Sequence, residues 1–231
     1  MEKLDDVVAF PPLALQEPIP PLRIPRREEL RTNIEELRMK KPVSDARFDS
    51  IYPKLIQRLS STHWTPVRVA RRAAELLVRG EKTRILDVGS GAGKFCLVAS
   101  LTTDAVVVGV EQRSYLVRLC QRLAKHYGIE QARFIQGNMM DMDWSSFDGF
   151  YLYNPFIENV YDAAIRIDNG LEQTRLLYER YVRIVQMNLH RARAGTRVVT
   201  YHGFGGQMPP GYVCKLREPM ASDRLEFWEK E

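Results

Sequence analysis

Two patterns of apolar residues alternate along the chain from about residue 65. Apolar residues between Val69 and Leu77 recur at helical spacing, in a helix that begins near Pro66 and ends at Gly80. Short apolar runs then predict strands at 84–88, 105–110, 133–136, 149–153 and 196–202, separated by helices at about 93–101, 114–127 and along a segment containing Leu177 and Leu189. Strands that alternate with helices indicate a parallel sheet with right-handed crossovers.

The alternation changes near the C-terminal end. Only residues 203–210 separate the strand at 196–202 from the next apolar run, which is too short for an ordinary crossover helix. The runs at 212–217 and 224–229 are therefore expected to form an antiparallel hairpin. We predict an α/β fold with a Rossmann-like, mostly parallel seven-stranded sheet, a C-terminal hairpin and an N-terminal extension.

The N-terminal extension has a different composition. Residues 1 to about 45 are rich in proline, which predicts an extended arm, and its leucines and isoleucines indicate that it packs on the rest of the protein. A short helix is expected at 27–38. With 231 residues, of which 45% are hydrophobic, the chain is long enough for one large core. We divide it into an arm and helix, residues 1–60, and a sheet domain, residues 61–231.

Composition and charge add little about partners. The net charge of +5 comes from 34 basic and 29 acidic residues, so the arginines between Arg175 and Arg193 are interpreted as a solvated helix face and only weakly suggest nucleic acid. The first ten residues do not resemble a secretory signal, and no apolar run is long enough to cross a membrane. We expect a cytoplasmic protein without membrane contact. Cys96, Cys120 and Cys214 are too dispersed for a metal site and are expected to be buried.

The clearest motif is the segment RILDVGSGAGKF at residues 84–95, in which a strand leads through three alternating glycines into a helix. Glycines allow the backbone to approach a ligand closely. A phosphate-binding loop would need Gly where Val88 stands and Ser or Thr where Phe95 stands, and a dinucleotide fingerprint would need Gly or Ala in place of Lys94. Both of these loops fit the sequence poorly.

Two acidic residues further restrict which ligand the loop can bind. Asp87 ends the first strand, where a carboxylate would repel a pyrophosphate but suits a ligand with an amino group. Glu111 ends the second strand, where an acidic side chain can accept hydrogen bonds from both hydroxyls of a ribose. An amino group and a ribose occur together in S-adenosylmethionine.

The pattern Asp87-x-Gly89-x-Gly91-x-Gly93, followed by Glu111, resembles the class I S-adenosylmethionine-dependent methyltransferases over most of residues 60–231. The resemblance implies S-adenosylmethionine as cofactor, and it implies that Asn138 and Met139 lie beside the adenine. Trp64 and Thr65, which precede the helix after Pro66, are expected to reach over the cofactor. The expected cofactor-binding residues are Asp87, Gly89, Ser90, Gly91, Gly93, Glu111, Gln112, Asn138, Met139, Trp64 and Thr65.

The fourth strand ends in the segment YLYNPF, residues 151–156, at the edge of the sheet where ligands bind in such folds. The side chain of Asn154 and the carbonyl of Pro155 could accept hydrogen bonds from an amine, while Phe156 covers the acceptor. These three residues are the expected catalytic residues. The segment is similar to the Asn/Asp-Pro-Pro-aromatic motif of amino-group methyltransferases, although only one proline is present.

A second resemblance involves the non-SET histone-lysine methyltransferases, which this chain resembles in the glycine loop, in the strand ending at Glu111 and in Thr65-Pro66. We predict methyl transfer to an amine or lysine-like nitrogen, with a protein as one candidate acceptor. A nucleic-acid methyltransferase and a non-catalytic cofactor-binding module are the alternatives. His63 and His202 are interpreted as structural, and Glu158 is a weak candidate to take a proton from the acceptor.

Overall fold

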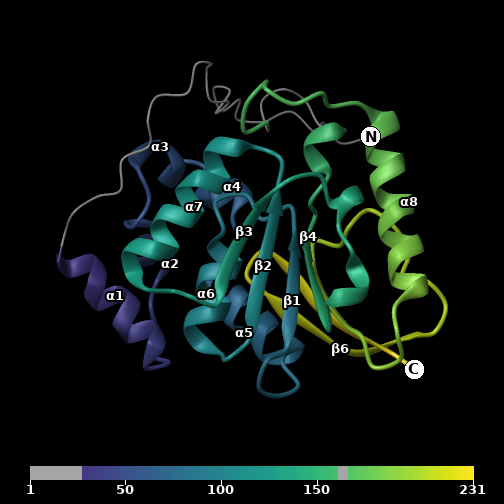
Figure 1. The fold of residues 1–231 in the computed structure, drawn as a ribbon, viewed down its shortest axis with the longest axis horizontal. Coiled ribbons are helices and arrows are strands. Elements are labelled where there is room, and N and C mark those ends of the chain that lie inside the picture. Colours follow the sequence, from purple (N-terminus) through teal and green to yellow (C-terminus); the bar gives the residue numbers. More distant parts are fainter. Residues whose placement is uncertain (1–27, 161–165) are drawn as a thin grey trace, which may run out of the picture.

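The computed structural model of the protein describes residues 28–160 and 166–231. Seven strands form one sheet in the order β3-β2-β1-β4-β5-β7-β6 (Figure 1). The first five strands of this order are parallel to one another, whereas β7 is antiparallel to both β5 and β6. This architecture confirms the predicted fold class, including the terminal hairpin. The strands are β1 (Arg84–Val88), β2 (Val106–Glu111), β3 (Ala132–Gln136), β4 (Gly149–Tyr153), β5 (Arg197–Tyr201), β6 (Tyr212–Met220) and β7 (Asp223–Lys230).

Helices cover both faces of the sheet (Figure 1). Alternate strand residues such as Ile85 and Val107 point into one core with helices α5, α6 and α7, and Leu86 and Val108 point into a second core with α8 and the 3-10 turns η1 and η2. The helices are α1 (Glu28–Arg38), α2 (Asp45–Asp49), α3 (Lys54–Gln57), α4 (Ser60–His63), α5 (Val67–Leu77), α6 (Lys94–Thr102), α7 (Ser114–Tyr127) and α8 (Arg175–Arg191), with 3-10 turns η1 (Met139–Asp141), η2 (Trp144–Ser146) and η3 (Ile157–Asn159).

The segment before the sheet is part of the main core. Ile34 and Leu37 of α1, together with Phe48 and Ile51 of the α2 region, are completely or almost completely buried in the same cluster as α5 and α6. The predicted helix at 27–38 corresponds to α1. The first 27 residues of the proline-rich arm lie outside the described residues.

A buried lysine joins this N-terminal segment to the glycine loop. Lys94, the first residue of α6, is only 2% exposed, and its Nζ lies 2.7 Å from a carboxylate oxygen of Asp45 and 2.7 Å from one of Asp49. The same Nζ donates a hydrogen bond to Ser60 Oγ at 3.2 Å. Because an unpaired buried charge is costly, these contacts hold α2 and α4 against the start of α6.

The carboxyl ends of β1, β2, β4 and β5 meet at one edge of the sheet, which is where the loops after Val88, Glu111, Tyr153 and Tyr201 come together. Cys96 and Cys120 are buried as predicted. Cys214 is partly exposed because it lies on β6, which is the outermost strand of the sheet. Among the residues that the structure describes, no helix is long and apolar enough to cross a membrane.

Candidate active site

A cavity of about 220 Å³ opens at this edge of the sheet. Its walls come from α4 and the residue after it, from the glycine loop, from the end of β2, and from the loops after β4 and β5. The lining residues are Thr62, His63, Trp64, Gly89, Gly91, Glu111, Arg113, Tyr153, Asn154, Pro155, Ile157, Glu158, Ile167 and His202. Six of the residues predicted to bind the cofactor or act in catalysis are among them: Trp64, Gly89, Gly91, Glu111, Asn154 and Pro155.

The glycine loop, residues 89–93, packs against other parts of the protein and also lines the cavity. Gly91 has φ +52°, and a Cβ placed there would lie 2.3 Å from Cζ3 of Trp64. The indole of Trp64 is fixed in turn by a hydrogen bond of 3.2 Å from Nε1 to the carbonyl of Ile56. Gly91 is therefore required by the close packing of Trp64, and the loop and the residue after α4 form one wall of the cavity.

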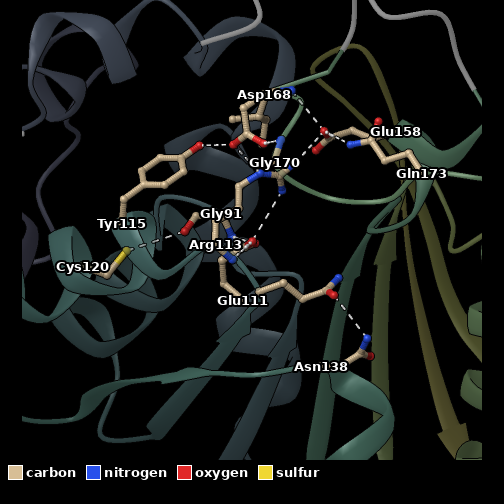
Figure 2. Close-up of polar contacts among 12 residues, drawn as sticks. Gly91, Glu111, Arg113, Tyr115, Cys120, Asn138, Glu158, Asp168, Gly170 and Gln173 are labelled. Carbon is tan, nitrogen blue, oxygen red and sulfur yellow. Dashed lines mark hydrogen bonds and ion pairs between the residues drawn. The ribbon is translucent and has the colours of Figure 1, made fainter. Parts of the chain in front are cut away.

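Glu111 binds the glycine loop from the end of β2. Its Oε2 accepts a hydrogen bond from the backbone N–H of Gly91 at 3.2 Å, and its Oε1 accepts one from the backbone N–H of Arg113 at 2.9 Å (Figure 2). The carboxylate is buried and lies in the cavity wall. Glu111 therefore lies next to the glycine loop, and its carboxylate accepts hydrogen bonds from backbone N–H groups.

Arg113 lies at the centre of a buried charged cluster (Figure 2). Its guanidinium donates to Asp168 at 2.8 Å and to Glu158 at 2.7 Å, and it is 3.5 Å from Glu111. Asp168 also accepts a hydrogen bond from the hydroxyl of Tyr115. These contacts tie the loop after β4 to the end of β2 and give the cluster three carboxylates for one guanidinium.

Glu158, the predicted proton acceptor, is occupied by this cluster. Its Oε2 accepts from the guanidinium of Arg113, from the backbone N–H of Ile167 at 3.0 Å and from Nε2 of Gln173 at 3.1 Å. Burial raises the pKa of Glu158 in spite of the neighbouring Arg113. The contacts make Glu158 a fixed part of the wall.

Asp87 is buried behind the cavity wall, with 4% of its surface exposed. Burial raises its pKa to about 7, although the thiol of Cys96 donates a hydrogen bond of 3.2 Å to Oδ2, and the charge of Glu111 raises the pKa further. A carboxyl group in such surroundings is stabilised in its charged form by a nearby cation.

The end of β4 supplies the opposite wall. Asn154 has φ +38°, a left-handed backbone conformation that asparagine adopts more readily than most residues with a side chain, and its N–H donates to the carbonyl of Gly203 at 2.9 Å. Within the described residues, the amide of the Asn154 side chain makes no hydrogen bond. Pro155 packs against Gly89, so the end of β4 contacts the glycine loop directly.

Phe156 occupies a different place from the expected one. Its ring is 5% exposed and stacks on Tyr181 of α8, with 5.0 Å between the ring centroids, in the second core. It does not belong to the lining of the cavity. Tyr153, at the last position of β4, is the aromatic residue that lies in the cavity wall instead, because the chain turns after the strand and directs Phe156 into the second core.

The remaining predicted residues lie around the site without lining the cavity. Asn138 Nδ2 donates to Gln112 Oε1 at 3.2 Å and to the hydroxyl of Tyr181 at 2.9 Å, so the two predicted polar residues contact each other. Met139 is buried in the second core. The hydroxyls of Thr65 and Tyr151 are 3.0 Å apart.

Two small residues of the glycine loop, Ser90 and Gly93, also lie outside the lining of the cavity. Ser90 is buried. A Cβ on Gly93 would lie 2.6 Å from the ring of Phe134 and 2.9 Å from the sulfur of Cys120. These residues therefore shape the loop from outside the cavity.

Sequence reasoning missed several residues of the site. Arg113, Tyr153 and Ile167 line the cavity, and Asp168 holds Arg113. Arg113 follows the acidic strand end by two residues, a signal that is visible in the sequence but has no fixed meaning there. His63 and His202, both interpreted as structural, also lie in the wall. Burial, together with the charge of Arg113, lowers the pKa of His63 to about 4.

Comparisons with known proteins agree with this arrangement. Residues 79–169 match a family model described as "Methyltransferase domain". The RNA methyltransferase from Salinibacter ruber, solved in complex with S-adenosyl-L-homocysteine, superposes with a TM-score of 0.52 and 22% identity, over 72% of this chain and 92% of that one. TrmN from Thermus thermophilus gives a TM-score of 0.53 and 17% identity, over 78% of this chain and 54% of that one. Residues 79–169 of this chain are therefore similar to a methyltransferase domain, and the superpositions show the same fold. The predicted family resemblance is confirmed.

A curated relative matches a smaller part of this chain than the solved structures do. The sterol 24-C-methyltransferase of Clavispora lusitaniae is 32% identical over 95 residues, which are 38% of this chain and 25% of the relative. The chain thus spans about a quarter of the length of the curated relatives it matches.

Proposed function

We propose that the protein is an S-adenosylmethionine-dependent methyltransferase that acts on an amine nitrogen of the lysine type in the cytoplasm. The observation that supports this most directly is the cavity itself. Glycine-loop residues and Glu111 form one side of it, and Tyr153, Asn154 and Pro155 form the other, at the edge of the sheet where this fold binds ligands.

The residues present fit the cofactor. Glu111 offers a buried carboxylate at the cavity wall for ribose hydroxyls, and Asp87 offers a carboxyl group whose charged form a cationic amino group would stabilise. The positive φ values of Gly89 and Gly91 let the loop backbone pass close to a ligand. When bound, S-adenosylmethionine supplies a methyl group on a positively charged sulfur.

The cavity wall around Asn154 and the neighbouring acidic cluster favour an amine as the methyl acceptor. The side-chain amide of Asn154 has an oxygen that can accept a hydrogen bond from an N–H group, and its left-handed backbone is held by a hydrogen bond to Gly203. The acidic residues Glu111, Glu158 and Asp168 outnumber the one arginine among them, so the cluster attracts cations. Asn154 would orient the nitrogen lone pair, and the closely packed wall would exclude water from the reacting atoms.

The two alternatives have less support. A nucleic-acid acceptor would be favoured by a basic surface beside the cavity, but the arginines from Arg175 to Arg191 are spread along α8, which is about 25 Å long, and Arg193 follows the helix. Arg175 pairs with Glu179 and Arg193 with Asp148, which precedes β4 at the opposite edge of the sheet. A binding module without catalysis would leave the unbonded Asn154 amide without a role.

The test is methyl transfer from radiolabelled S-adenosylmethionine into a cell lysate separated into protein, nucleic acid and small molecules. We expect label in amine groups of protein or small molecules. Asn154→Ala should lower transfer by about a hundredfold and change cofactor affinity less than about threefold, because Asn154 would orient the acceptor and not the cofactor. Label only in nucleic acid, or binding of the cofactor without labelling of any fraction, would contradict the proposal.

A further inference from the structure

His202 and Asp223 contact each other where the ends of β4 and β5 form the cavity wall. His202 follows β5 and lines the cavity, and its Nδ1 is 2.7 Å from Oδ2 of Asp223, the first residue of β7. The sequence positions are 21 residues apart and are brought together by the antiparallel pairing of β7 with β5. A histidine with one ring nitrogen held by a carboxylate has its tautomer fixed, so the other nitrogen can exchange a proton.

The backbone around the pair is braced by hydrogen bonds. His202 has φ +57°, so it and Asn154 are two residues with a left-handed backbone that follow the neighbouring strands β5 and β4, both in the cavity wall. The hydroxyl of Tyr201 accepts a hydrogen bond from the backbone N–H of Ser222 at 3.1 Å and lies 3.0 Å from the carbonyl of Met220. These bonds fix the turn before Asp223 against the end of β5.

We propose that His202, oriented by Asp223, is the general base of the methyl transfer. In this step the acceptor nitrogen gives a proton to Nε2 of His202. The freed lone pair forms a bond to the methyl carbon, and the electron pair of the broken carbon–sulfur bond stays on sulfur. The proton leaves His202 to solvent, which the partly exposed ring can reach. This inference rests on the proposed function.

Other groups in the wall are less suited to this role. Burial, with a further contribution from Tyr201 and Asp223, raises the pKa of Tyr153 to about 12, so its hydroxyl stays protonated at neutral pH. His63 has a pKa of about 4, because it is buried, and is a weak base. Glu158 is occupied by Arg113 and by two further donors.

Four residues contact the imidazole of His202. Asp223 contacts Nδ1, the hydroxyl of Ser222 lies 3.3 Å from Nε2, and the rings of Tyr153 and Tyr201 pack against the imidazole. The charged or titratable groups elsewhere in the cavity wall are Glu111, Arg113, Glu158 and His63, among the described residues.

The experiment compares wild type with His202→Asn, chosen because asparagine tolerates a left-handed backbone. His190→Asn is the matched control, since His190 is exposed on α8. Transfer of label from S-adenosylmethionine is measured with poly-L-lysine and with the protein fraction of a lysate, between pH 6 and 10. Cofactor affinity and melting temperature are measured for each variant.

We expect His202→Asn to lower transfer by about a hundredfold at neutral pH with cofactor affinity unchanged, whereas His190→Asn behaves as wild type. The loss should shrink near pH 10, where a lysine-type amine loses its proton to solvent at its reference pKa of about 10.4. Added imidazole should restore part of the rate. Asp223→Asn should lower the rate less than His202→Asn does.

Two results would overturn the inference without affecting the proposed function. One is an active wild type with an equally active His202→Asn variant. The other is a folded, weakly active His202→Asn variant that neither alkaline pH nor imidazole improves, since that would indicate a structural role. A wild type that binds cofactor but labels neither substrate nor any lysate fraction would refute the proposed function, and the inference with it.

Discussion

Replacing Asp87 by asparagine should make the free protein more stable at neutral pH while removing cofactor binding. Burial raises the pKa of Asp87 from 3.8 to about 7. The folded state therefore holds a proton that the unfolded chain has already released, and stability falls as the pH rises from about 4 to about 7. A shift of about 3 units corresponds to about 4 kcal/mol, at about 1.36 kcal/mol per unit. Asparagine is neutral throughout and lacks this penalty.

Urea unfolding at pH 5 and pH 8 measures the effect. Between these values the free energy of unfolding of Asp87→Asn, relative to wild type, should rise by about 3 kcal/mol, because about two pH units of the titration lie in this window. Asp104→Asn, a change at an exposed aspartate, is the control. Parallel curves for wild type and Asp87→Asn would refute the reasoning, because Asp87 would then titrate alike in both states.

Three further changes test the packing around the site. Gly91→Ala should displace the neighbouring indole and weaken cofactor binding at least tenfold, by calorimetry, because the new Cβ would lie 2.3 Å from that ring. Phe156→Ala should lower the free energy of unfolding by about 3–5 kcal/mol in urea, because the ring is buried in the second core. Deletion of residues 1–60 should abolish cooperative thermal unfolding, because the core loses the side chains of α1 to α3.

Each of these three has a contradicting outcome. Gly80→Ala is the control for Gly91→Ala, since a Cβ at Gly80 meets nothing within 4 Å among the described residues. Equal cofactor affinity in both alanine variants would contradict the packing of the glycine loop. A Phe156→Ala protein of normal stability that has lost only acceptor affinity would place the ring in the cavity. A cooperatively folding fragment without residues 1–60 would show that the segment is separable from the core.

The strands of the sheet could be predicted from local sequence because each is short, apolar and bounded by turns. The predicted ranges 84–88 and 149–153 coincide with β1 and β4, which are central strands buried on both faces. The hairpin was predictable from the short link before it. The predicted end of the first hairpin strand, Arg217, falls three residues before the end of β6, whose alternating exposure continues through Pro219 to Met220.

The site was less predictable, because its residues meet through the fold. Glu111 and the glycines belong to one continuous motif with a recognisable pattern. Arg113 and Asp168 are 55 residues apart, and nothing in the local sequence pairs them. Phe156 was placed wrongly in space because its position next to Asn154 suggested the same surroundings, whereas the chain turns after the strand and directs the ring into the second core.

The assignment of the cofactor site depends most on Glu111. Isothermal titration of S-adenosylmethionine should show one site per wild-type chain and an affinity about 10- to 150-fold weaker for Glu111→Gln, which corresponds to about 1.5–3 kcal/mol for lost hydrogen bonds to a charged group. Glu130→Gln, a change at an exposed glutamate after α7, should bind as wild type does. A wild type that does not bind the cofactor, or a folded Glu111→Gln variant with unchanged affinity, would contradict the assignment.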